Sequence, residues 1–287
     1  MNSHVQAILI AAASLLSTSS YSVEISSGTS EYITMRNCSV VGVTGCDTIT
    51  GVLYGSYGGL PGDSQSTAGL TVNGYGSGSG SVSLSGVIGA PILKASATSE
   101  AGKRINTNSI ALQRYVYDGS ISSIRTFGGT ISYSQSSTGT YPIGTGNGIS
   151  AYLEIFSLPT STITIFPSSS ANFNMLFGGF SRLPGFSSLG EAAFLDGNST
   201  SNGLGSIGVT VNLNPGDALW VWALVQTPAT NGGWIDSSHT FVTAWNETSN
   251  LTPSAVAVPE PKTLALLLSG IIFIAYVKKT HQSRRAN

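Results

Sequence analysis

The chain has 287 residues, of which only 9% are charged, and its formal net charge is −1 at pH 7. Globular domains usually have about 25% charged residues, and a nearly neutral chain without a basic surface excludes nucleic acid as a partner. Glycine is enriched, with 35 residues, yet 41% of all residues are hydrophobic and 9% are aromatic. Such low charge with so much Gly, Ser, Thr and Asn is typical of extracellular β-rich proteins, and the apolar content argues for a packed core instead of intrinsic disorder.

The first 22 residues have the features of a signal peptide. Residues 5–16 (VQAILIAAASLL) are apolar and are followed by small residues, as in secretory signals. Cleavage after Ser22 would place Ser20 at the −3 position. Residues 1–4 contain no Lys or Arg, so either the natural start lies further upstream or the signal is weak. A buried N-terminal helix is the alternative, but we expect residues 1–22 to direct export.

Cys38 and Cys46 are the only two cysteines. In an exported chain we expect them to form a disulfide across a tight hairpin or loop. Closing so short a loop would stabilise the fold by roughly 2–3 kcal/mol. Two thiols without a nearby histidine are too few ligands for a metal site.

Residues 23–245 are predicted to form one antiparallel β-sandwich or jelly-roll-like domain. No stretch shows a sustained helical period, whereas short segments rich in β-branched and aromatic residues recur between Gly, Ser and Asn turns. Residues 69–89 are either a hairpin or a linker. Residues 219–226 (LWVWALVQ) are almost entirely apolar, which indicates a strand buried on both faces. The other expected strands are 39–43, 48–54, 111–118, 125–133, 151–158, 161–166 and 209–213.

Catalytic chemistry has weak candidates. His239 is the only histidine of the mature domain, and its neighbours Asp236, Ser237 and Ser238 are unsuited to a catalytic triad because successive strand residues alternate between faces. The side chains at 196, 198, 200 and 202 have calcium-loop spacing, but only Asp196 is charged, so we expect no metal and no cofactor.

Two glutamates remain as candidates for glycoside hydrolysis. Glu154 and Glu191 could act as paired carboxylates. The alternative for Glu154 is a sheet-surface carboxylate, or an ion pair with Arg114 or Arg125. We favour the alternative, and with it a protein that is not an enzyme.

Trp220 and Trp222 are two positions apart and should share one face of a strand. If exposed, they could form a platform for sugar rings. The alternative, which we favour, is that they fill the core of the sandwich.

The last thirty residues carry the most specific pattern of the chain. Residues 246–257 are polar and are expected to form a stalk. Val258, Pro259, Glu260 and Pro261 follow, and the prolines cannot continue a strand or a helix interior. Residues 264–277 (LALLLSGIIFIAYV) are uncharged and include Gly270; Lys278, Lys279, Arg284 and Arg285 come after them. Such basic residues hold a hydrophobic segment on the cytoplasmic side. The apolar run is several residues shorter than the 20 or so that a stable span needs, which suits transient anchoring.

This arrangement resembles the PEP-CTERM sorting signal of bacterial surface proteins. The resemblance covers residues 258–285, although the basic residues are split into two pairs. It implies secretion, transient membrane insertion through residues 264–277, and recognition by exosortase, a membrane-embedded transpeptidase-like enzyme. Residues 212–241, with Pro215-Gly216-Asp217 and Asp236, also resemble the last hairpin of PEP-CTERM β-sandwich domains. We therefore expect an exported, non-enzymatic protein of the cell surface or exopolysaccharide matrix. The alternatives are a carbohydrate-binding module and, less favoured, a secreted hydrolase.

Overall fold

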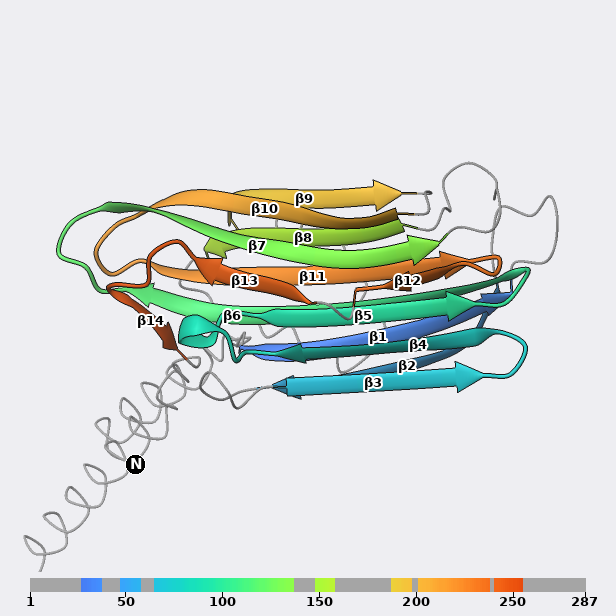
Figure 1. Ribbon diagram of the computed structural model, residues 1–287. Helices are drawn as coiled ribbons and strands as arrows, with labels where there is room; N and C mark the ends of the chain where they lie inside the picture. The colour runs from blue at the N-terminus through green and yellow to red at the C-terminus, as the bar shows by residue number, and fades with distance from the viewer. Residues whose placement is uncertain are drawn as a thin grey trace, which may run out of the picture.

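The structure is a computed structural model that describes residues 27–37, 47–57, 65–136, 148–157, 187–197, 201–237 and 240–254. These residues form two antiparallel sheets that pack face to face, and their strands run along the long dimension of the sandwich (Figure 1). No α-helix occurs among them. The all-β antiparallel sandwich is thus as predicted from the sequence. The helices expected at 1–22 and 264–277 lie outside the described residues.

The first sheet, sheet A, has the strand order β2-β1-β6-β11-β8-β9, and β14 also pairs with β6. Its strands are β1 (Gly28–Asn37), β2 (Asp47–Tyr57), β6 (Lys103–Tyr117), β8 (Gly148–Ser157), β9 (Ser187–Gly197), β11 (Ala218–Thr230) and β14 (Leu251–Ser254).

The second sheet, sheet B, has the order β10-β7-β12-β5-β4-β3, and β13 pairs with β5 and β7. Its strands are β3 (Gln65–Val72), β4 (Gly76–Ser83), β5 (Ile92–Ser99), β7 (Ser123–Ser136), β10 (Ser201–Leu213), β12 (Trp234–Asp236) and β13 (Phe241–Trp245), with a short 3₁₀ turn, η1 (Val87–Gly89), before β5. Residues 69–89 are therefore the β3–β4 hairpin and the turn after it, not a linker.

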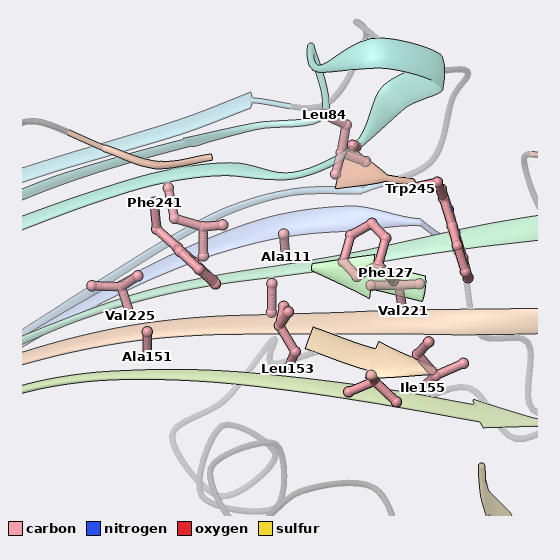
Figure 2. Packing of buried hydrophobic residues seen from close by; sticks show 14 of the residues in the cluster. Leu84, Ala111, Phe127, Ala151, Leu153, Ile155, Val221, Val225, Phe241 and Trp245 are labelled. Atoms are coloured by element: carbon pink, nitrogen blue, oxygen red, sulfur yellow. The ribbon is translucent and has the colours of Figure 1, made fainter. Parts of the chain in front are cut away.

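The larger hydrophobic cluster fills the space between the sheets. Leu153 and Val221 from sheet A meet Phe127 and Trp245 from sheet B (Figure 2). The Trp245 ring also packs edge-on against Tyr115, with centroids 5.6 Å apart, and lies 5.0 Å from the Phe127 ring. Aromatic pairs of this kind contribute about 0.5–1.5 kcal/mol each beyond the area that they bury. The alternation of buried and exposed residues in β13 follows from this packing, because every second side chain faces sheet A.

Strand β4 (GSGSGSVS) brings the two sheets unusually close. A Cβ atom at Gly78 would lie 2.6 Å from Oγ1 of Thr107, and one at Gly80 would lie 2.1 Å from Oε2 of Glu31. Since real Cβ atoms do not approach so closely, this strand needs glycine at both positions for steric reasons. The glycine repeat of β4 therefore permits close packing between the two sheets.

The predicted stalk begins too early. Residues 251–254 form β14, which pairs with β6 from Leu251↔Tyr117 to Ser254↔Arg114, and Leu251 is buried in the main cluster. Residues 246–254 therefore belong to the sandwich. The rest of the proposed stalk, 255–257, lies outside the described residues, as do the expected strands at 39–43 and 161–166.

Candidate functional site

The outer face of sheet A points away from sheet B. In β11 the odd-numbered residue Val221 belongs to the core between the sheets, so Trp220 and Trp222 point the other way. The register places Trp222 opposite Leu112 of β6 and Glu154 of β8. Even-numbered residues of these three strands thus share the outer face, and β11 is buried on both faces, as its apolar sequence predicted.

Toward the end of the sandwich that carries Ser254, this face is apolar. Trp220 stacks parallel to Phe156, with the ring centroids 6.5 Å apart and the planes 9° apart. Trp222 lies two residues further along β11, opposite Leu112 of β6. The two tryptophans share a face, as expected, but that face is not the one between the sheets. Each side chain is only 4% exposed, so neither ring is open to a sugar in this structure.

The two candidate carboxylates are brought together. Glu154 and Glu191 are Cα partners on β8 and β9, which places both side chains on the outer face. Glu191 is exposed, whereas Glu154 is 2% exposed. A hydrolase needs both carboxyl groups within reach of one glycosidic bond, and in this structure Glu154 has almost no access to solvent.

Toward the opposite end the same face becomes polar and cationic. Arg36 of β1 and Arg104 of β6 are Cα partners, and both are half-buried. Further along the strands, Nδ2 of Asn106 donates to Oδ1 of Asn108 at 3.3 Å, and Nε2 of Gln226 donates to Oδ1 of Asn106 at 3.4 Å. These five residues are called the polar half of the outer face. Sequence reasoning missed them; the only signal was an unusual polar stretch, RINTNS, at the start of a strand.

A titratable side chain, Glu31, lies between the sheets. Glu31 is completely buried, and burial raises its pKa well above the usual value, although a hydrogen bond with Ser109 opposes the shift. Oγ of Ser109 lies 2.8 Å from Oε2 of Glu31 and 2.6 Å from the carbonyl oxygen of Lys94, but its one proton can be donated only once. When Glu31 is ionised, Oγ of Ser109 can donate to its Oε2; when Glu31 is protonated, it can instead donate to Oγ of Ser109, which is then free to donate to the carbonyl oxygen of Lys94. Oε1 of Glu31 is buried without a hydrogen-bond partner. Burial thus favours the neutral form of Glu31 in the folded protein.

Of the remaining catalytic candidates, the structure describes Asp236 and Ser237. Oγ of Ser237 donates to the carbonyl oxygen of Ala95 at 2.6 Å and accepts from its N–H at 3.1 Å, so this hydroxyl binds β12 to β5. Ser238 and His239 lie outside the described residues. Within the described ranges no three His, Cys, Asp or Glu side chains come close enough to hold a metal ion.

Several predicted features lie outside the described residues: the disulfide pair Cys38 and Cys46, and the sorting residues Val258, Pro259, Glu260, Pro261, Gly270, Lys278, Lys279, Arg284 and Arg285. Among the residues whose structure is described, no helix is long and apolar enough to cross a membrane.

Comparison with protein-family models and with curated proteins gives no match. Among solved structures, the chain is similar to one from a study of the promiscuous specificity of carbohydrate-binding modules from the β-sandwich superfamily. The sequences are 12% identical, the match covers 79% of this chain and 95% of the other, and the TM-score is 0.24. A similarity this low carries no inference about the ligand, so the function has to be argued from the residues of this chain.

Proposed function

We propose that the chain is an exported, non-enzymatic protein of the cell surface or exopolysaccharide matrix, sorted by exosortase through residues 258–285. The tail pattern is the basis of this proposal. A structural observation supports the proposal: Ser27, at the start of the described sandwich, and Ser254, at its end, lie side by side.

Arg114 ties these ends together. Its backbone N–H donates to Oγ of Ser27 at 3.2 Å, and its Nη1 donates to Oγ of Ser254 at 2.5 Å. Oγ of Ser27 in turn donates to the carbonyl oxygen of Ser254 at 3.3 Å. In Figure 1 the start of β1 and the end of β14 both lie at the left-hand end of the sandwich. This supports delivery and anchoring from one end.

The length of β6 separates the polar half from the end of the sandwich that carries Ser254. Strand β6 has 15 residues, and at about 3.3 Å per residue it spans roughly 50 Å. Arg114 lies near one end of β6 and Arg104 near the other. A domain held by its tail would thus present the polar half on the side away from the membrane.

Intact-mass analysis of the protein from the medium and envelope fractions of the native host tests the proposal. We expect a species that lacks the first 22 or so residues and the region after residue 257. Pro259→Ala together with Glu260→Ala should leave the tail uncut, whereas Thr252→Ala together with Val256→Ala, before the motif, should not. Recovery of the wild-type protein with its full C-terminus in the inner membrane would refute sorting and make the tail a plain anchor.

A secreted hydrolase is a less favoured candidate: Glu154 and Glu191 are direct partners across two strands, but Glu154 is only 2% exposed. Turnover of a glycan or ester panel by the wild type, abolished by Glu154→Gln and by Glu191→Gln, would support it. Absence of turnover on every substrate of the panel would refute the hydrolase candidate.

A further inference from the structure

Arg36 and Arg104 place two positive charges directly opposite each other on neighbouring strands. Like charges at such positions destabilise a sheet. Within the described part of the chain, the one salt bridge joins Arg125 and Glu247, and the side chains of Arg36 and Arg104 make no hydrogen bond or ion pair there. Burial, and then the charge of Arg36, lowers the pKa of Arg104. A partly desolvated cation pair of this kind gains most from an external anion, since a guanidinium presents several N–H donors that match a carboxylate.

The amides beside this pair offer hydrogen bonds to hydroxyl groups. A carboxamide has two N–H donors. Asn106 uses one of its donors on Asn108, Gln226 uses one of its donors on Asn106, and Asn108 holds this arrangement by donating to the carbonyl oxygen of Tyr32 at 3.3 Å. Asn106 and Gln226 are half-buried, so each keeps one N–H that can reach a ligand on this face.

The spacing suits an extended ligand. Gln226 is the Cα partner of Asn108, which is four residues from Arg104 on β6, so Arg104 and Gln226 are about 13 Å apart along the strands. Strands β1, β6 and β11 span about 10 Å across. A small inorganic anion would occupy the arginines and leave the amides unused. A neutral glycan would leave the two charges unpaired. A chain that carries both carboxylates and hydroxyls matches the whole polar half.

We propose that the polar half of the outer face binds an acidic polysaccharide, with a uronate carboxylate between Arg36 and Arg104 and hydroxyl groups on Asn106 and Gln226. This inference deepens the proposed matrix function and rests on it for the source of the ligand. The interaction is non-covalent, and it places the polymer on the side of the domain away from Ser27 and Ser254.

The test is equilibrium binding of the full chain, in mild detergent, to alginate, with dextran as a neutral glycan and inorganic phosphate as a small anion. Arg104→Gln and Arg36→Gln should each weaken alginate binding roughly 10- to 100-fold, because each removes charge-assisted hydrogen bonds. Gln226→Ala should weaken it roughly 2- to 10-fold. Lys94→Gln, which removes one exposed positive charge from the outward side of sheet B, should leave it unchanged.

Circular dichroism verifies that each variant is folded. If Arg104→Gln does not fold, Arg104→Lys keeps the charge but removes the planar fork, and it should still weaken alginate binding. Unchanged binding in the arginine variants, an equal loss with Lys94→Gln, equal binding of dextran, or phosphate binding without alginate binding would each overturn the proposal. Because this assay does not depend on tail processing, a failure of sorting and a failure of polysaccharide binding are distinguishable.

Discussion

Replacing Glu31 with glutamine should stabilise the protein at neutral pH and change it little near pH 4.5. The pKa of Glu31 is raised in the folded state by burial, whereas in the unfolded chain it returns to its usual value of about 4.3. Below the unfolded value both states hold the proton, and the stability from the neutral carboxyl is fully present. As the pH rises toward the folded pKa, the unfolded state loses its proton first, and that stability is lost.

The size of the stability difference follows from the titration of a single proton, the one on Glu31. The advantage of the Glu31→Gln variant over wild type should grow by about 1.4 kcal/mol for each pH unit above the unfolded pKa, and become constant once the folded pKa is passed. Glutamine keeps the shape of the side chain beside Gly80, and its N–H can replace the carboxyl proton as donor to Ser109. The difference between the two proteins isolates this site, because all other titrating groups are shared.

Urea unfolding followed by tryptophan fluorescence, from pH 4.5 to pH 8, measures the difference. Glu191→Gln, on the exposed edge strand β9, controls for the loss of one negative charge. A difference between wild type and Glu31→Gln that stays constant over this pH range would refute the conclusion that Glu31 is a neutral buried acid.

Two further predictions concern packing and the hairpin. Gly129→Ala should lower the free energy of unfolding by about 1–3 kcal/mol, because its Cβ would lie 2.4 Å from Cε2 of the buried Phe241. Gly197→Ala should be nearly neutral, since no atom lies within 4 Å of its Cβ. Urea unfolding of both variants measures the difference, and equal effects would contradict the prediction. Asn37 and Asp47 are the last described partners of β1 and β2, and they directly precede Cys38 and follow Cys46. The oxidised chain should therefore show no free thiol in a thiol assay, and Cys38→Ser together with Cys46→Ser should lower the free energy of unfolding by roughly 2–3 kcal/mol. Two titratable thiols in the secreted protein would refute the disulfide.

Strands β11 and β14 show what the sequence could and could not predict about the fold. The apolar run in β11 predicted a strand buried on both faces, and the structure confirms it. The segment LTPS is polar and contains Pro253, so its sequence favours a stalk and not a strand. It is a strand only because it pairs with β6 and buries Leu251, and such non-local pairing leaves no local signal.

The candidate site depended even more on distant neighbours. A period of two predicted that Trp220 and Trp222 share a face, but not which one, because β11 is apolar on both sides. The contact between Arg36 and Arg104 is set by the register of β1 against β6. The burial of Glu31 likewise depends on the close approach of β4. None of these arrangements could be inferred from a segment considered alone.

The adjacency of Ser27 and Ser254 makes the sandwich a candidate for circular permutation, because a few flexible residues could join ends that are already hydrogen-bonded. New ends could be opened in the exposed β3–β4 turn around Gly74, at the opposite end of the strands. Any segment fused there would leave the domain beside the polar half instead of far from it. In such a permuted chain every strand would keep its partners, but a fused anchor would be attached at the end of the sandwich that carries the polar half.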